Sequence, residues 1–299
     1  MSNDSRIGQA WGKAAEEGAP WIVHGNTDVW FGGAARAFMS YAMKVDRMVW
    51  FQSSAAGLEN PALQAFGGKA EIYTSSHVQS DAIAEWVLWA GLDFFGNGAE
   101  RRAVQASGRW TFVPFRELSS TRWMIVGFGH IGAATASRLK ALGAHVTGVR
   151  RSGGTSPHAN KIIHPDQMLE QLGDTDAVLL CCPHTPETED LANAAFFSAM
   201  KDGSLFLNVG RGALVNEGDL MDALDKGRPA HATLDVVREE PLPPESPIWA
   251  HPNITLTSHT SANTQQSRFR NDQLFVDNLT AFLSGGELRN VIDPSEFDD

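Results

Sequence analysis

Short apolar runs alternate with amphipathic stretches along the chain from Arg122 onward. The runs have the length of buried strands and end at glycine, proline or polar residues. Helical periodicity fills most of the intervals between them, as at 131–142, where Gly143 should end the helix. Strands separated by helices pair in parallel through right-handed crossovers, so this part of the chain predicts a doubly wound α/β sheet. The expected strands lie at 123–126, 145–149, 177–181, 204–209, 232–236 and 254–257.

The first ninety residues are less regular and predict a second, smaller α/β unit. Apolar runs lie at 21–24 and 48–51, and a long helical pattern extends from Ser80 to about Phe95. Because these runs are separated by turn-forming residues, we expect short strands here, accompanied by helices.

An amphipathic helix near the end of the chain should pack on this smaller unit. It covers 273–283 and stops at a pair of glycines. The smaller unit would then be discontinuous in sequence. We expect it to comprise 1–92 and 270–299, and the larger unit to comprise 93–269.

Composition and charge narrow the classes of function. The length of 299 residues predicts two domains or one large α/β domain. A composition of 42% hydrophobic and 20% charged residues is typical of a folded protein. The formal net charge is -11 and no block of Lys or Arg occurs. The attraction that drives binding to a phosphate backbone is therefore missing, so nucleic acid is not an expected partner.

Cysteine placement and hydropathy indicate a cytoplasmic protein that does not enter a membrane. Cys181 and Cys182 are adjacent in an apolar run, which suits reduced thiols better than a structural disulfide. No apolar stretch is long enough to span a bilayer, and the first residues lack the apolar core of a signal peptide. Two adjacent cysteines without a second pair do not make a zinc site, so no metal is expected.

Three glycines form a turn directly after the first strand of the larger unit. Gly127, Gly129 and Gly132 lie in VGFGHIG, between a predicted strand and a predicted helix. There the first glycine permits a tight turn, the second lets a pyrophosphate approach, and the third lets helix and strand pack closely. The helix start at His130 and Ile131 adds N–H donors and a positive dipole end. The context favours dinucleotide binding over a plain strand-to-helix turn.

The end of the second strand indicates which dinucleotide binds. NAD-selective enzymes carry an acidic residue there, whereas this chain has Arg150, Arg151 and Ser152. Guanidinium and hydroxyl groups can bind a 2′-phosphate through charge-assisted hydrogen bonds. We therefore predict NADP(H) in preference to NAD(H), with one of the two arginines only a solvated surface charge.

Three further segments each end a predicted strand, where ligands bind in this architecture. They read NVGRGALVNE at 208–217, LDVVREEPLP at 234–243 and HPNITLTSHTSA at 251–262. Together with CCPHTPETEDL at 181–191, they resemble the D-isomer-specific 2-hydroxyacid dehydrogenase family in order and spacing, from about Met48 to Val291. The resemblance implies a Rossmann cofactor domain and a smaller, discontinuous, flavodoxin-like α/β substrate domain.

The resemblance also implies a catalytic set of arginine, glutamate and histidine. Reduction of a 2-oxo acid needs a cation for the carboxylate and a proton donor for the carbonyl oxygen. Arg211 matches the cation, because a planar guanidinium binds carboxylates in a geometry that lysine does not reproduce. His259 matches the proton donor. Glu240 matches the carboxylate that orients this histidine, and it is preferred to Glu239 because it directly precedes Pro241.

Other positions match the family's cofactor contacts. Pro183 and Thr188 would lie in the loop on the adenine side, and Gly210 would let the chain pass close to the nicotinamide. Asp235 matches the position that contacts the nicotinamide carboxamide. The alternative for Asp235 is a strand-end residue that caps local backbone amides.

In the smaller unit, WFQSSAAGLEN at 50–60 resembles the family's carboxylate-binding loop. Backbone N–H groups near Ala56 and Gly57 would face the substrate there, together with the side chain of Arg211.

The expected activity is the reduction of a small 2-oxo acid, of the glyoxylate or hydroxypyruvate type, to the D-2-hydroxy acid with NADPH. The family also implies a homodimer, with the WTFVPFREL region at 110–118 in its interface. Two alternatives remain at this stage. One is NAD-dependent oxidation of 3-phosphoglycerate or a related 2-hydroxy acid, which the two arginines disfavour. The other is a non-catalytic dinucleotide-sensing protein, which turnover on any 2-oxo acid would exclude.

Overall fold

The computed structural model describes residues 18–58, with the exception of 32, and 60–297. The chain divides into two compact units. One contains the described residues up to Val78 together with those from Thr264 on, and the other is Gln79–Asn263. The division therefore falls earlier than the expected boundaries at 92/93 and 269/270.

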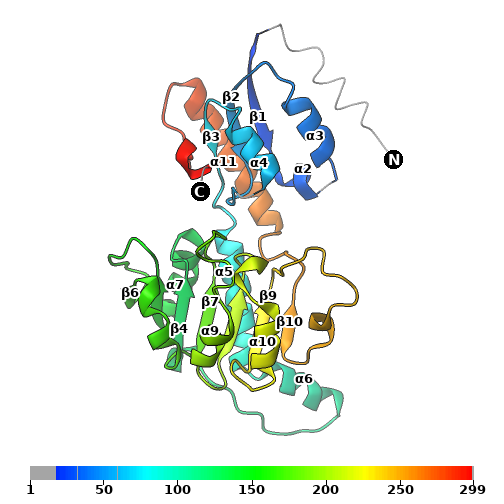
Figure 1. Ribbon diagram of the computed structural model, residues 1–299, viewed down its shortest axis with the longest axis vertical. Helices are drawn as coiled ribbons and strands as arrows, with labels where there is room; N and C mark the ends of the chain where they lie inside the picture. The colour runs from blue at the N-terminus through cyan, green and yellow to red at the C-terminus, as the bar shows by residue number, and fades with distance from the viewer. Residues whose placement is uncertain (1–17, 32, 59, 298–299) are drawn as a thin grey trace. The chain divides into compact units, whose positions relative to one another are not determined.

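The larger unit is built on a seven-stranded parallel sheet (Figure 1). The strand order is β10-β9-β8-β7-β4-β5-β6, so the strand that is first in sequence lies inside the sheet, as in a doubly wound fold. The predicted α/β class is confirmed. The strands are β4 (Arg122–Val126), β5 (His145–Val149), β6 (Lys161–Ile163), β7 (Ala177–Leu180), β8 (Leu205–Asn208), β9 (His231–Leu234) and β10 (Ile254–Leu256).

Helices cover both faces of this sheet, and each face has its own core. Successive strand residues point to opposite faces, so Trp123 and Ile125 belong to one cluster, whereas Met124 and Val126 belong to another. The first cluster includes side chains of α5 (Ser80–Phe95) and α7 (His130–Ala141). The second includes side chains of α8 (Leu169–Leu172), α9 (Ala194–Ala199) and α10 (Glu217–Leu224). The helix α6 (Gly98–Ala106) follows α5.

Helix α5 explains why the division lies before residue 79. Ile83 and Val87 are buried in the same cluster as Trp123, and a Cβ on Gly91 would come within 2.7 Å of the Trp123 ring. The helix buries its apolar face on the larger sheet, so it belongs to that unit throughout its length.

The smaller unit contains a three-stranded parallel sheet in the order β1-β2-β3. On one face, Phe51 stacks on Phe66, with ring centroids 4.1 Å apart. On the other, Trp50 stacks on Phe275 and Phe282 of the C-terminal helix α11. Its elements are β1 (Pro20–Gly25), α2 (Thr27–Phe31), α3 (Ala35–Ala42), β2 (Arg47–Ser53), α4 (Pro61–Gly67), β3 (Tyr73–Thr74) and α11 (Gln265–Leu283).

Helix α11 returns to the smaller unit, as predicted, but begins eight residues before the predicted start at 273. The side chain of Thr264 accepts a hydrogen bond from the Ser267 N–H and caps the helix. In the part of the chain that the structure describes, no helix is long and apolar enough to cross a membrane.

Candidate active site

Most of the predicted site residues lie in turns that leave one edge of the larger sheet. All strands of this sheet are parallel, so their carboxyl ends meet at that edge. The turns follow β4 at Gly127–Gly132, β5 at Arg150–Ser152, β7 at Pro183–Thr188, β8 at Gly210 and Arg211, β9 at Asp235–Glu240, and β10 at His259.

The three glycines of the first turn occupy positions with different requirements. Gly127 has a φ of 95°, and a Cβ on it would lie 2.4 Å from the Cys182 nitrogen. A Cβ on Gly132 would lie 2.7 Å from the Gly127 oxygen, so this glycine lets the helix pack on the strand. Gly129 is the N-cap of α7, and a Cβ on it would meet no atom within 4 Å. This open space, directly before the first turn of α7 at His130, fits the pyrophosphate of a dinucleotide.

The two arginines after β5 differ in their surroundings. Arg150 donates to the Gly153 oxygen at 2.6 Å and to the Thr155 oxygen at 3.2 Å, and so holds its own turn together. Arg151 and Ser152 are exposed at the same turn. Of the pair, Arg151 is therefore the one whose guanidinium can meet a ligand phosphate, whereas Arg150 shapes the turn.

The turn after β7 is closed by the hydroxyl of Thr188. This oxygen donates to the Pro183 carbonyl at 2.9 Å and accepts from the Thr185 N–H at 2.7 Å. Thr188 thus fixes the conformation of the loop on which Pro183 is exposed. Contacts of either residue with a cofactor remain a prediction.

The turn after β8 is held by Asn208, whose amide accepts from the Gly210 N–H at 3.0 Å and donates to the Arg211 carbonyl at 2.8 Å. Gly210 lies so close to the neighbouring turn that a Cβ would be 2.8 Å from the Cys182 oxygen. The Arg211 guanidinium donates to the Gly210 carbonyl at 2.7 Å. Arg211 is therefore presented from a short turn with a defined backbone.

Asp235 at the end of β9 is 2% exposed and organises the segment that carries His259. Its carboxylate accepts from the Thr257 hydroxyl, from the Thr260 N–H at 2.9 Å, and from the N–H and hydroxyl of Ser261. These contacts agree with the alternative interpretation of Asp235, in which it is a strand-end residue that caps local backbone amides. Its predicted contact with the nicotinamide remains untested.

His259 lies in an unusual backbone conformation and contacts Glu240 directly. Its φ is 53°, in the left-handed region, and its N–H donates to the Asp235 carbonyl at 2.7 Å. The His259 Nδ1 atom is 2.7 Å from the Glu240 Oε2 atom. An ionised carboxylate can only accept, so the contact with ionised Glu240 requires a proton on Nδ1. The structure thus brings together two of the three residues predicted as catalytic, with Arg211 on the adjacent strand end.

The two cysteines directly follow β7 at the same edge, in surroundings that disfavour the thiolate. Burial raises the pKa of the Cys182 thiol to about 11 and that of the Cys181 thiol still further. The Cys181 thiol donates to the Gly127 carbonyl at 3.1 Å. Both are free thiols, as the sequence predicted.

Ala56 and Gly57, the predicted substrate-binding positions, follow β2 in the smaller unit. The Ser53 hydroxyl accepts from the Ala55 N–H at 3.0 Å and shapes the turn that leads into them. Among the described residues, no group of three or more His, Cys, Asp or Glu is arranged to hold a metal ion.

Comparison with known proteins assigns the family. The model of the D-isomer specific 2-hydroxyacid dehydrogenase family, NAD binding domain, matches residues 89–261. The chain belongs to this family. The match spans the glycine turn and every catalytic position predicted above.

Two curated relatives show the level of sequence similarity. The chain is 36% identical over 187 residues to a hydroxypyruvate reductase of Blautia hydrogenotrophica, which covers 61% of this chain and 57% of the relative. It is 32% identical over 215 residues to a glyoxylate/hydroxypyruvate reductase B of Escherichia fergusonii, and this match covers 70% of this chain and 59% of the relative. The chain therefore spans less than two thirds of the length of these relatives.

A solved member of the 2-hydroxyacid dehydrogenase family extends the similarity to three dimensions. The enzyme from Xanthobacter autotrophicus Py2, in complex with NADPH and MES, matches with a TM-score of 0.66 and 31% identity. The match covers 75% of this chain and 92% of that one.

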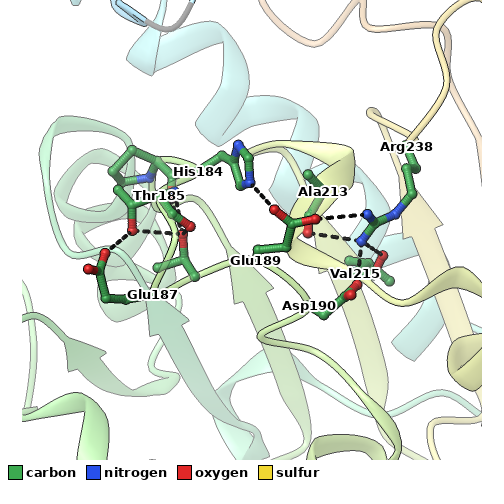
Figure 2. Close-up of polar contacts among 10 residues, drawn as sticks. His184, Thr185, Glu187, Glu189, Asp190, Ala213, Val215 and Arg238 are labelled. Atoms are coloured by element: carbon green, nitrogen blue, oxygen red, sulfur yellow. Dashed lines mark hydrogen bonds and ion pairs between the residues drawn. The ribbon is translucent and has the colours of Figure 1, made fainter. Parts of the chain in front are cut away.

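The contacts of Arg238 in this chain were not predicted from the sequence. Arg238, two residues before Glu240, binds Glu189 and Asp190 in the turn after β7 (Figure 2). The sequence contains the two acidic residues, Glu189 and Asp190, in PETEDL and the basic residue Arg238 in VVREEP. The hydrogen bonds of Arg238 show that the two segments meet, although β8 separates β7 from β9 in the sheet.

Proposed function

We propose that this protein is an NADP(H)-dependent 2-hydroxyacid dehydrogenase that reduces a small 2-oxo acid to the D-2-hydroxy acid. The observation that carries the proposal is the 2.7 Å contact between His259 Nδ1 and Glu240 Oε2 at the carboxyl edge of a doubly wound sheet. Support also comes from the names of two relatives, a hydroxypyruvate reductase and a glyoxylate/hydroxypyruvate reductase. We therefore propose glyoxylate and hydroxypyruvate as the type of substrate.

The chemistry that we propose for the chain's own residues is a proton transfer beside a bound carboxylate. A bound reduced nicotinamide would supply the hydride to the carbonyl carbon. Arg211 binds the substrate carboxylate and polarises the carbonyl, a task suited to its planar guanidinium. Protonated His259 gives a proton to the carbonyl oxygen as negative charge develops there. Glu240 keeps the ring oriented and stabilises its charged form. Backbone N–H groups at Ala56 and Gly57 would add donors for the carboxylate.

The proposed preference for NADP(H) rests on the turn after β5. Arg151 and Ser152 are exposed there, and no acidic side chain occupies the strand end. The related enzyme that was solved with NADPH supports this assignment. NAD-dependent oxidation of 3-phosphoglycerate or a similar acid remains the second candidate, and it predicts a preference for NAD.

We further propose that the protein is a cytoplasmic homodimer and that the segment after α6 forms part of the dimer interface. Trp110 is fully exposed and Phe112 is 89% exposed. The segment is nevertheless held in place, because Arg101 donates to the Val113 carbonyl and Asn97 to the Pro114 carbonyl. Ordered, exposed aromatic side chains mark protein interaction surfaces. Sedimentation of the double variant Trp110→Ser and Phe112→Ser should give a monomer, and a dimer would contradict this interface.

Steady-state oxidation of NADPH and of NADH, with glyoxylate and with hydroxypyruvate, tests the proposed function. We expect turnover with both acids and a higher kcat/KM with NADPH. A preference for NADH together with oxidation of 3-phosphoglycerate would favour the second candidate. Tight binding of either dinucleotide without turnover on a wide panel of 2-oxo acids would identify a dinucleotide-sensing protein instead.

A further inference from the structure

Arg238 joins three turns at the carboxyl edge of the larger sheet. Its guanidinium donates to the Glu189 carboxylate at 3.2 Å and to the Asp190 carboxylate, both in the turn after β7 (Figure 2). It also donates to the carbonyl oxygens of Ala213 at 3.2 Å and Val215 at 3.1 Å, just after β8. The planar, multiply donating guanidinium is suited to such a set of acceptors, which a single ammonium group does not match.

The backbone around Arg238 is held as firmly as its side chain. The Arg238 N–H donates to the Glu217 carboxylate at 2.7 Å, and the Val237 N–H donates to Glu240 Oε1 at 3.2 Å. Gly212 packs against this turn so closely that a Cβ would lie 1.9 Å from the Val237 carbonyl carbon. The turn at 237–240 is therefore located by contacts to the two neighbouring turns, and it carries Glu240.

We propose that Arg238 is a positioning residue, which fixes the turn at 237–240 so that Glu240 faces His259. The inference rests on the proposed function for its effect on catalysis. Its effect on the Glu240–His259 contact is independent of any reaction.

One acceptor of Arg238, the Glu189 carboxylate, is also bound by His184. Glu189 Oε2 lies 3.1 Å from His184 Nε2, while Glu189 Oε1 binds Arg238. The hydrogen bonds from His184 and Arg238 hold the pKa of Glu189 below its ordinary value. The loop that carries the predicted cofactor contacts Pro183 and Thr188 is thereby linked to the turn that carries Glu240.

These ion pairs are half-exposed, so their contribution to overall stability should be small. The expected consequence of losing them is a displaced turn in a folded protein. Arg238→Met keeps the aliphatic stem and removes every donor, whereas Arg238→Lys keeps the charge and loses the fork. Arg228→Met is the control, because Arg228 likewise donates to a carboxylate, that of Asp202, and to a carbonyl, that of Ser198, but away from this edge.

The decisive readout is the tautomer of His259. It is measured at alkaline pH from the ¹⁵N resonances of the imidazole side chain, which are assigned by comparison with a His259→Asn variant. Wild type and Arg228→Met should show the proton on Nδ1, held by Glu240. Arg238→Met should shift the population toward the Nε2-protonated tautomer, with partial recovery in Arg238→Lys. The Tm should change by less than about 3 °C.

Kinetics give the second readout. In Arg238→Met we expect kcat to fall about tenfold, because Glu240 no longer orients His259, and KM for the 2-oxo acid to change less than about threefold. An unchanged tautomer in Arg238→Met would overturn the proposal. If the wild type shows no turnover, the proposed function fails, while the tautomer still decides the role of Arg238. Should Arg238→Met not fold, the double variant Glu189→Gln and Asp190→Asn gives the same tautomer test with Arg238 in place.

Discussion

The Nδ1 atom of His259 lies 2.7 Å from the Oε2 atom of Glu240, although the two residues follow different strands of the sheet. The left-handed backbone of His259, tied to the Asp235 carbonyl, turns the ring toward this carboxylate. The contact determines which ring nitrogen carries the proton in the neutral form.

Replacing either partner should impair the proposed reduction to different extents. His259→Asn removes the proton donor and should lower kcat by roughly 10²–10⁴. Glu240→Gln keeps the shape and loses the charge, so a smaller loss, about 10–100-fold, is expected. Steady-state kinetics with NADPH and hydroxypyruvate measure both losses. NADPH affinity, followed by fluorescence, should change little, and full activity in His259→Asn would refute the assigned role.

The two arginines after β5 should respond differently to removal. Arg151→Ala should raise KM for NADPH by about 10–100-fold, the range expected for a lost charge-assisted hydrogen bond, and leave KM for NADH nearly unchanged. Arg150→Ala releases the Gly153 and Thr155 carbonyls, so it should weaken both cofactors together. Equal effects of Arg151→Ala on the two cofactors would show that the exposed arginine does not meet the 2′-phosphate.

Alanine substitutions in the glycine turn should separate binding from stability. Gly129→Ala adds a methyl group to open space, so the Tm should hold while NADPH affinity falls at least tenfold. Gly132→Ala places a methyl group 2.7 Å from the Gly127 oxygen and should lower the free energy of unfolding by about 1–3 kcal/mol. Thermal melts and fluorescence titrations provide both quantities. A cofactor affinity that survives Gly129→Ala would move the pyrophosphate away from this turn.

The smaller unit should lose stability in mild acid because of His24. Burial lowers the pKa of His24 from 6.5 to about 4, and the ring stacks on Phe275. As the pH falls from 6.5 to 4, the unfolded chain binds a proton that the folded chain does not. The free energy of unfolding should therefore fall by about 1.4 kcal/mol per pH unit from this group.

Urea titrations at several pH values test this dependence on His24. Between pH 6.5 and 4.5, the free energy of unfolding of His24→Phe, which preserves the stack, should fall by about 2–3 kcal/mol less than that of the wild type. The exposed His158, changed to Gln, serves as the control. Identical pH dependence in wild type and His24→Phe would assign the acid sensitivity to other groups.

Much of the larger unit follows from local pattern. The strand at 145–149 was predicted with its exact bounds, because an apolar run stands between Gly143, which ends a helix, and the polar turn at Arg150. The strand β6 (Lys161–Ile163) was missed, because three residues at a sheet edge carry no periodicity. The boundary at 92/93 was placed too late, because a helix pattern does not reveal the sheet on which the helix packs.

Site residues were predictable where they belong to a recognisable sequence motif. They were less predictable where their role depends on contacts with other segments of the chain. The glycine turn followed from spacing, and the contact between Glu240 and His259 was expected from the family resemblance. Asp235 accepts hydrogen bonds from residues 257–261, which follow the neighbouring strand β10, and Arg238 reaches past β8 to the loop after β7, so both sets of contacts depend on the order of the strands in the sheet. The sequence alone does not show the order of the strands in the sheet.

Gly212 has a consequence for how this protein can change. The backbone of Val237 occupies the space where any side chain at this position would begin, so the nineteen other residues are closed to it. The turn that presents Arg211 and the turn that presents Glu240 therefore share a backbone contact that substitutions elsewhere in either turn have to preserve. A mutant library aimed at new substrates should therefore hold Gly212 constant.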